Sequence, residues 1–251
     1  NVETLEFGVT NSKAWQVGLT CGGKIKVFLE KFSKNELHLI QKINNIYNNE
    51  GKLILATNLS NGKNEIIESN NLNNALFSEM FLNENSKISV FNDANWFLKV
   101  FTSQYKVIIV GAVHIAESLV DLANILNFKV FLIDPRNNFD VSKFKKKAKL
   151  LTEWPDEVLK KFKIDNKTCI VTLTHDPKLD DPAIIYSLKS NPLYIGCLGS
   201  VKTHNARIKR LLKKGFSSQE LSKINGPIGI DIKAKTPSEI ACSIIAQIIS
   251  R

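Results

Sequence analysis

The 251-residue sequence lacks long hydrophobic runs, paired cysteine spacings and a start methionine. No apolar run approaches the ~20 residues that a membrane helix needs, and no signal peptide opens the chain. The cysteines Cys21, Cys169, Cys197 and Cys242 are widely spaced, which favours a reducing compartment over a disulfide framework. The sequence therefore predicts a cytoplasmic protein with no membrane segment. Because it begins with Asn1 and its only methionine is Met80, we expect an N-terminal segment to be missing.

Acidic residues are also scarce, with 24 Asp and Glu against 34 Lys and Arg and a formal net charge of +10. Such a balance is typical of proteins that bind nucleic acids or other polyanions. However, the densest basic run, KFKKKAKL (143–150), is typical of a solvated face. No aromatic-interleaved basic motif, zinc spacing or recognition helix accompanies it. Charge alone therefore does not predict a nucleic-acid partner.

Residues 1–103 show short alternating runs that are typical of antiparallel strands. These runs are TLEFGV, KIKVFLE, KLILAT, NEIIES and KISVF. One amphipathic helix interrupts them at 35–49, and the asparagine-rich stretch 68–79 is interpreted as a loop or an irregular connection. The pattern predicts a smaller N-terminal α+β domain, incomplete at its start.

Residues 104–251 alternate between strands and helices instead. The run KVIIV (106–110) is wholly apolar, as expected for a strand buried in a parallel sheet. The last helix begins at Thr236, with Pro237 at its first position and Glu239 closing a capping box. This rhythm predicts an α/β domain with a Rossmann-like, doubly wound parallel sheet. Ligands of such sheets bind outside the carboxyl ends of the strands.

The segment GAVHIA (111–116) joins the first of these strands to a helix. A dinucleotide-binding loop has the pattern G-x-G-x-x-G/A here, with an acid about 20 residues on. Gly111 and Asp134 fit the pattern, but Val113 replaces the middle glycine that lets a pyrophosphate approach the backbone. The segment thus indicates the fold more strongly than NAD binding. His114 stands at the helix N-terminus, where it either contacts a ligand or only packs.

The segment LTHDPKLDD (173–181) places His175 and Asp176 at the end of another strand. A histidine beside carboxylates at such a position suits an acid–base pair or a metal site. No second histidine lies at metal spacing, so we do not expect a preformed zinc site. The alternative is a turn that starts at Asp176, with Asp181 capping the next helix.

The segment YIGCLGSVKTHNAR (194–207) ends a buried strand at Gly196 and Gly199 and leads into a basic helix. The helix carries a hydroxyl and three basic side chains near its start: Ser200, Lys202, His204 and Arg207. Glycines, a hydroxyl and cations at a helix N-terminus can form a phosphate cradle. The alternative is an ordinary strand-to-helix turn with a solvated basic face.

The segment GLTCGG (18–23) places Cys21 beside Gly22 and Gly23, just before an alternating strand. Glycines remove steric bulk, so a ligand can approach both the backbone and the thiol. A thiolate is a soft ligand suited to soft or high-valent metals. A cysteine that merely fills a turn is the alternative.

Six stretches together resemble the XdhC/CoxF (CoxI) family of maturation factors for xanthine and carbon monoxide dehydrogenases. They are GLTCGGKIKVFLE, VIIVGAVHIAESL, VFLIDPRNNF, VTLTHDPKLDDPAI, YIGCLGSVKTHNARIKRL and PIGIDIKAKTPSEIACSIIAQII. The resemblance is collinear from about Leu5 to the end of the chain. The usual family loop is glycine-alanine-glycine-histidine, and the form with Val113 resembles a subset of members.

The resemblance implies a chaperone that holds the molybdenum cofactor, as molybdopterin or its cytosine dinucleotide form. Such a protein protects the cofactor during sulfuration by a cysteine desulfurase and delivers it to an apo-xanthine or apo-carbon monoxide dehydrogenase-type molybdoenzyme. The family also leads us to expect a homodimer. By analogy Cys21 contacts the molybdenum. The candidate cofactor-binding residues are Cys21, Gly22, Gly23, Gly111, His114, Asp134, Arg136, His175, Asp176, Gly199, Ser200 and Lys202.

Three functions therefore compete on the sequence. A cofactor chaperone with no turnover of its own is the favoured interpretation. An NAD(P)-dependent oxidoreductase is supported by the predicted sheet and Asp134 and opposed by Val113. A nucleic-acid binder is supported by charge alone.

Overall fold

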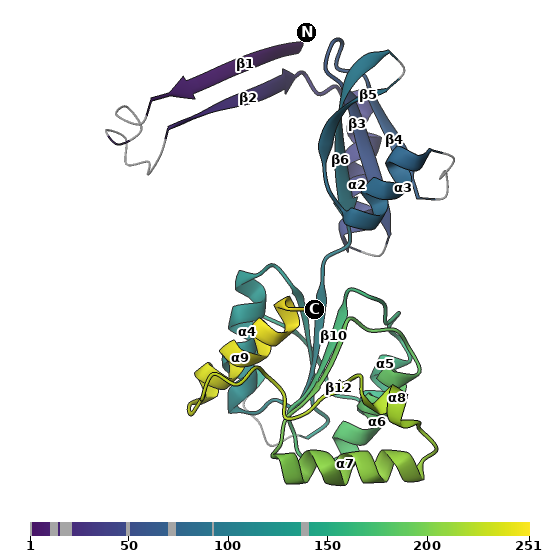
Figure 1. The fold of residues 1–251 in the computed structure, drawn as a ribbon, viewed down its shortest axis with the longest axis vertical. Coiled ribbons are helices and arrows are strands. Elements are labelled where there is room, and N and C mark those ends of the chain that lie inside the picture. Colours follow the sequence, from purple (N-terminus) through teal and green to yellow (C-terminus); the bar gives the residue numbers. More distant parts are fainter. Residues whose placement is uncertain are drawn as a thin grey trace. The chain divides into compact units, whose positions relative to one another are not determined.

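The structure is a computed structural model that describes residues 2–10, 15, 22–48, 51–69, 74–91, 93–136 and 141–251. The chain divides into two compact units, Asn1–Ser103 and Gln104–Arg251 (Figure 1).

The N-terminal unit is built on a four-stranded antiparallel sheet in the order β4-β3-β6-β5. The strands are β3 (Lys52–Asn58), β4 (Asn64–Glu68), β5 (Lys87–Phe91) and β6 (Ala94–Thr102). Alternate residues of β6, among them Trp96, Leu98 and Val100, are buried in a core shared with helix α3 (Ala75–Asn83). A short helix η1 (Lys34–Glu36) leads into α2 (Leu37–Asn48), as the helical spacing predicts.

The first two strands form a separate antiparallel ribbon. Strand β1 (Val2–Val9) pairs along its length with β2 (Gly23–Glu30), with Val2 opposite Glu30 and Val9 opposite Gly23. The ribbon confirms the prediction of antiparallel strands at this end of the chain.

One prediction for this unit is wrong. The stretch 68–79 is not wholly a loop, because α3 begins within it, at Ala75. The Asn74 side chain accepts a hydrogen bond from the Leu76 N–H (2.9 Å) and so caps the helix. Asparagine is a preferred N-cap residue, so the asparagines that suggested a loop also supply the start of a helix.

The C-terminal unit contains a six-stranded parallel sheet in the order β12-β11-β10-β7-β8-β9. The strands are β7 (Lys106–Val110), β8 (Lys129–Ile133), β9 (Lys149–Leu151), β10 (Thr168–Thr172), β11 (Tyr194–Cys197) and β12 (Ile224–Asn225). In chain order this is the 3-2-1-4-5-6 arrangement of the doubly wound dinucleotide-binding fold. The predicted Rossmann-like sheet is confirmed.

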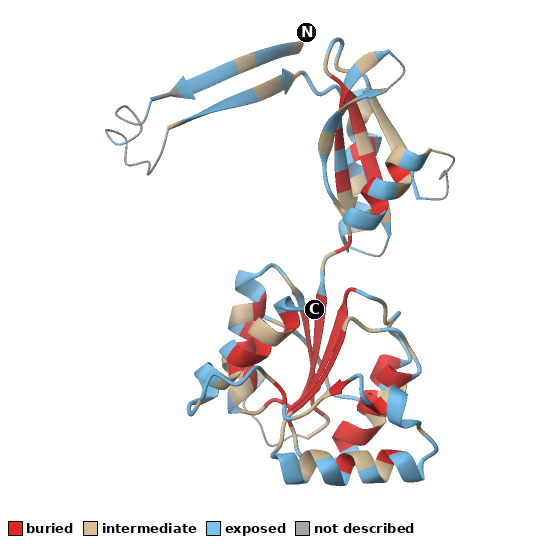
Figure 2. Cartoon of the chain, viewed as in Figure 1, coloured by how far each residue is buried: buried red, intermediate tan, exposed pale blue. Residues whose placement is uncertain are grey.

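Helices cover both faces of this sheet (Figure 1). One layer holds α4 (His114–Ile125), α9 (Pro237–Ile249) and η2 (Val141–Phe144). The other holds α5 (Pro155–Leu159), α6 (Pro177–Leu188), α7 (Val201–Lys213) and α8 (Ser218–Leu221). Strands β7 and β10 are buried throughout, and Figure 2 shows these buried strands between the helical layers.

Two helices of this unit, α9 and α6, begin near residues that the sequence predicts as caps. The capping box that begins α9 is present, since the Thr236 hydroxyl accepts from the Glu239 N–H (3.3 Å) and Glu239 accepts from the Thr236 N–H (3.0 Å). The expected cap at Asp181 is wrong, because α6 already begins at Pro177 and Asp176 is its N-cap. Asp181 lies inside the helix and binds Arg210 through two hydrogen bonds of 2.8 and 2.9 Å.

Among the described residues, no helix is both long and apolar enough to cross a bilayer.

Candidate functional site

The candidate site lies where the strand order reverses, at the carboxyl ends of β7 and β10. The chain leaves β7 through Gly111, whose φ of +112° is strained for any residue with a side chain. A β-carbon on Gly111 would stand 2.6 Å from the Thr174 Cγ2 atom, in the loop that follows β10. The two loops therefore touch at this point, and only glycine permits the contact.

Asp134 ties the Gly111 loop to the end of β8. Its Oδ2 atom accepts hydrogen bonds from the Ala112 N–H (2.7 Å) and from Arg136 Nη2 (2.8 Å). Its Oδ1 atom accepts from the Arg136 N–H (3.0 Å) and from Arg136 Nε (2.9 Å). Burial alone would raise the pKa of Asp134, but the hydrogen bonds from Arg136 and Ala112 outweigh burial and lower it. The carboxylate is thus held ionised.

This saturation changes the role expected for Asp134. A carboxylate offers about four lone-pair positions, and all four are occupied here. The hollow beside it, lined by Ala112, Leu132, Leu150, Leu151 and Thr152, holds about 30 Å³. Such a space holds only one or two waters. Asp134 therefore fixes the loop and does not offer an acceptor to a ribose hydroxyl.

The loop after β10 presents His175 in an unusual conformation. Its φ is +61°, a left-handed value that is uncommon for a non-glycine residue, and its side chain is exposed. The Thr174 hydroxyl holds the turn, because it accepts from the Asp176 N–H (3.1 Å) and donates to Asp180 Oδ1 (2.6 Å). The His175 Nδ1 atom lies 3.6 Å from the position that a β-carbon on Gly199 would take. The imidazole thus faces the loop after β11.

Beneath this turn lies a buried ion pair between α6 and α7. Asp180 and Arg207 are each 1% exposed, and the Asp180 Oδ2 and Arg207 Nη2 atoms are 3.7 Å apart. Arg207 also donates to the Leu198 carbonyl (2.9 Å) at the end of β11. Burial raises the pKa of Asp180, against the opposing effects of the Thr174 hydroxyl and Arg207. The pair connects the His175 turn to the β11 loop.

The predicted phosphate cradle cannot include Arg207, because its guanidinium is buried. The His204 ring is also partly buried. It packs on Gly226, where an added β-carbon would come within 2.0 Å of the His204 Nδ1 atom. Burial lowers the pKa of the ring. The helical spacing could have revealed this, since Arg207 shares a helix face with the buried Leu211.

The remaining candidates of this unit stand at helix N-termini. His114 is the first residue of α4, and its side chain is 91% exposed beside Glu117. Ser200 is the N-cap of α7, with its hydroxyl accepting from the Thr203 N–H (3.2 Å). Lys202 lies in the first turn of that helix and is exposed. Helix N-termini favour anions, so these positions suit a phosphate more than a cation.

The candidates in the N-terminal unit are less defined. Cys21 lies outside the described residues. Gly22 precedes β2, and a β-carbon on Gly23 would meet nothing within 4 Å. In the described ranges no group of three or more His, Cys, Asp and Glu side chains is placed to hold a metal ion.

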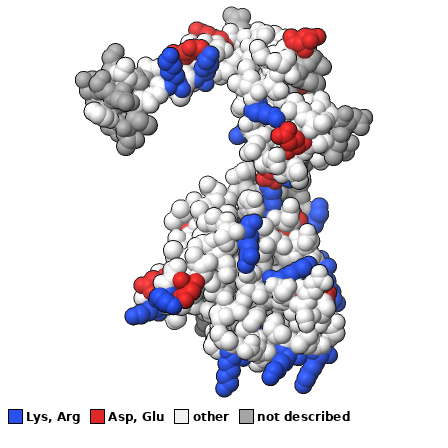
Figure 3. Space-filling model, viewed as in Figure 1, with Lys and Arg blue, Asp and Glu red and all other residues white. Residues whose placement is uncertain are grey.

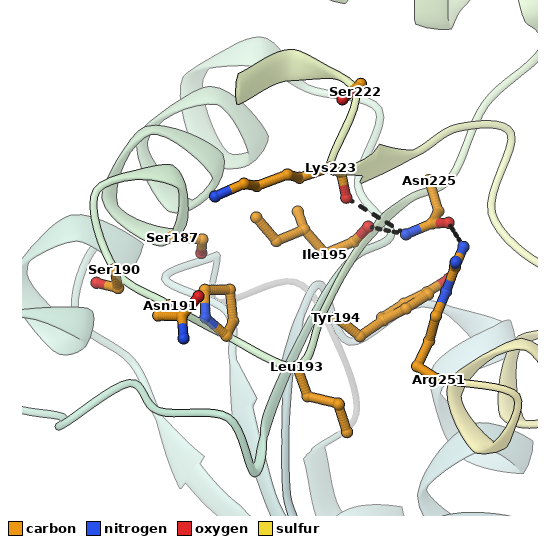
Figure 4. Close-up of a pocket in the computed structure, with 11 residues that line it drawn as sticks. Ser187, Ser190, Asn191, Leu193, Tyr194, Ile195, Ser222, Lys223, Asn225 and Arg251 are labelled. Carbon is orange, nitrogen blue, oxygen red and sulfur yellow. Dashed lines mark hydrogen bonds between the residues drawn. The ribbon is translucent and has the colours of Figure 1, made fainter. Parts of the chain in front are cut away.

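A second hollow of about 300 Å³ lies at the opposite edge of the sheet, where β11 and β12 begin (Figure 4). Its polar groups bind one another: Asn225 Nδ2 donates to the Ile195 carbonyl (2.9 Å), and Arg251 Nη2 donates to Asn225 Oδ1. Because ligands of doubly wound sheets bind at the carboxyl ends, this hollow is not the candidate site.

Comparison with known proteins places the C-terminal unit among described families. The family model of the XdhC Rossmann domain matches residues 107–248. The molybdenum cofactor insertion chaperone PaoD of Escherichia coli is 34% identical over 87 residues, which cover 35% of this chain and 27% of PaoD. A probable xanthine dehydrogenase subunit of Bacillus subtilis is 27% identical over 258 residues, which cover 94% of this chain and 72% of that protein.

One solved structure shares the fold over nearly the full length. The crystal structure of a xanthine dehydrogenase from Bacillus halodurans superposes with a TM-score of 0.71 at 22% identity, covering 99% of this chain and 74% of that one. The match to PaoD spans only about a quarter of PaoD's length.

Proposed function

Since the chain belongs to the family of the XdhC Rossmann domain, we propose that it is a molybdenum cofactor insertion chaperone serving a xanthine dehydrogenase-type molybdoenzyme. The observation that carries the proposal is the family match over residues 107–248, together with a curated relative that is named as such a chaperone. The molybdenum cofactor is then cargo, which the protein holds and passes on.

The chemistry of the site fits an anionic cargo. The terminal phosphate of molybdopterin would lie against the helix N-termini at His114 and at Ser200–Lys202, where backbone N–H groups and a lysine favour negative charge. Arg136, whose side chain is one-third exposed, adds a fixed cation. Gly111, Gly199 and the His175–Asp176 turn line the same edge of the sheet. A thiolate at Cys21 would supply the soft ligand that molybdenum accepts.

The finer steps belong to the same proposal. The protein would shield the cofactor while a cysteine desulfurase sulfurates it, release it to an apo-xanthine or apo-carbon monoxide dehydrogenase-type enzyme, and act as a homodimer. It would carry molybdopterin or its cytosine dinucleotide form. We place this activity in the cytoplasm.

The Cys21→Ser variant tests the proposed role of the thiol. An oxygen is a harder ligand than sulfur and is not ionised at neutral pH, so we expect retained molybdenum to fall at least about tenfold. The measurement is molybdenum and pterin content after gel filtration of the protein mixed with cofactor. Cys242→Ser is the matched control, because Cys242 is an exposed cysteine on α9. Equal retention by the two variants would remove Cys21 from the site.

An NAD(P)-dependent oxidoreductase is the second candidate, favoured by the strand order of the sheet. Two features oppose it. Val113 stands where a glycine would let the pyrophosphate approach the backbone, and the saturated Asp134 offers no acceptor to a ribose hydroxyl. We therefore expect fluorescence titration with NADH and NADPH to show no saturable binding below about 1 mM. A dissociation constant above that concentration corresponds to a binding free energy weaker than about −4 kcal/mol. A dissociation constant in the low micromolar range would favour the oxidoreductase.

A further inference from the structure

Helix α7 carries an unneutralised row of lysines that begins beside the candidate site. We propose that this row, Lys202, Lys209 and Lys213, is the docking surface for an acidic patch on the molybdoenzyme that receives the cofactor. The inference rests on the proposed function and deepens it by naming a surface for the client. Figure 3 shows basic side chains projecting from the edge of this unit at which Figure 1 places α7, with no acidic side chains drawn beside them.

The row is a single face of the helix. At 100° per residue the three lysines fall within about 40° of one another, opposite the buried Arg207 and Leu211. All three lysines are exposed. They therefore point away from the core of the unit, and an incoming surface can reach them together.

The pairing of charges separates this row from the other basic side chains of α7. The helix contains no acidic residue, and its two arginines are used inside the unit: Arg207 faces Asp180, and Arg210 binds Asp181. Within the described ranges none of the three lysines forms an ion pair.

The lysine-rich run 143–150 shows the contrast. Lys143 binds Glu117 (2.9 Å) and Lys147 binds Asp121 (2.7 Å), both on α4. That run is partly neutralised within its own unit. The three lysines of the α7 row form no such pair within the described ranges, so their charge remains available to a partner.

The composition of the face favours a protein over a nucleic acid. Val201 and Leu212, 63% and 44% exposed, border the lysine row, and the helix contains no Phe, Tyr or Trp on which a base could stack. Apolar side chains beside charges are typical of protein interfaces, in which complementary charge steers association. An acidic protein surface is therefore the occupant to which the proposal commits.

The lysine row lies next to the place where the cofactor is proposed to bind. Ser200 caps α7 at the mouth of the candidate site, and the lysines continue from there along the helix. A client that binds α7 would thus meet the carboxyl edge of the sheet, where the cofactor is proposed to lie. Lys202 is shared by both surfaces, so a clean test leaves it unchanged.

The test compares two double charge reversals in the full chain. Lys209→Glu/Lys213→Glu changes the row, and Lys149→Glu/Lys189→Glu makes the same change in net charge at exposed lysines on β9 and at the end of α6. The probe is the apo form of the xanthine dehydrogenase-type enzyme of the source organism, with affinity measured by biolayer interferometry at low and at moderate salt. Circular dichroism verifies folding, and gel filtration measures retained cofactor.

We expect the first variant to bind the apoenzyme at least about tenfold more weakly at low salt, mainly through slower association, and the second to change less than about twofold. Equal affinities of the two variants, salt-independent binding, or no binding by the unchanged protein would overturn the inference. Loss of duplex DNA binding in the first variant, with unchanged apoenzyme affinity, would overturn it in favour of a nucleic acid. Cofactor retention reports on the proposed function separately, because a chaperone that docks elsewhere would still retain its cargo.

Discussion

Gly111→Ala is expected to abolish cofactor retention and to lower the free energy of unfolding of the C-terminal unit by about 2–4 kcal/mol. Two effects add: the φ of +112° is strained for alanine, and the new β-carbon would stand 2.6 Å from Thr174 Cγ2. Relief of that contact must move the Gly111 loop or the Thr174–Asp176 turn. Both segments border the candidate site, so the substitution weakens cofactor binding as well as lowering the stability of the unit. Denaturant unfolding and molybdenum content after gel filtration measure the two losses.

Gly215→Ala is the matched control for this prediction. Gly215 follows α7 with a φ of +92°, but a β-carbon there would meet nothing within 4 Å. The control therefore carries backbone strain without a clash at the site. We expect it to lose about 1–2 kcal/mol of stability and to keep its cargo. If Gly111→Ala retained as much cofactor as Gly215→Ala, the switch point between β7 and β10 would not be the site.

Arg207→Met is expected to cost about 3–5 kcal/mol of unfolding free energy at neutral pH. It leaves the Asp180 carboxylate buried without its cation, at a position where burial already raises the pKa. Adding Asp180→Asn removes the stranded charge while an amide oxygen can still accept from the Thr174 hydroxyl. The double variant should therefore recover part of the loss. Urea unfolding of the two single variants and the double variant measures this coupling.

The same prediction has a definite pH dependence. A carboxyl group whose pKa is raised by folding binds its proton more strongly in the folded state, so protonation stabilises that state, and this contribution is lost as the pH rises through the folded-state pKa. Without Arg207 the pKa of Asp180 rises further. The stability difference between Arg207→Met and the unchanged protein should thus shrink as the pH falls from 7 to about 5. A difference that stays constant over this range would show that lost packing, not stranded charge, causes the destabilisation.

The C-terminal fold could be predicted from the sequence because its local signals agree with one another. Strands such as KVIIV are wholly apolar, the helices between them show helical spacing, and Thr236 with Glu239 marks the start of α9. The wrong predictions concern helix starts, where the same residue type is common both in loops and at helix caps. Asn74 caps α3 although asparagine also favours loops, and Asp176 starts α6 although Asp181 is also followed by a proline.

The location of the candidate site was predictable for a different reason. The carboxyl ends of parallel strands meet at one edge, so Gly111 and His175 are brought close although they are far apart in the sequence. The engagement of each side chain was not predictable, because it depends on partners from other elements. Asp134 proves saturated by Arg136 and Ala112, and Arg207 proves buried against Asp180. Helical spacing places Arg207 on the buried face of α7, but neither its pairing with Asp180 nor the saturation of Asp134 follows from residue type or spacing alone.

The proposed function makes one demand that can be tested directly on the unchanged protein. The measurement is gel filtration of the purified chain after incubation with molybdenum cofactor, with molybdenum and pterin quantified in the protein peak and NADH incubated in parallel. We expect molybdenum and pterin to co-elute with the protein at about one per chain, and NADH not to co-elute. Co-elution of NADH without molybdenum or pterin would contradict it.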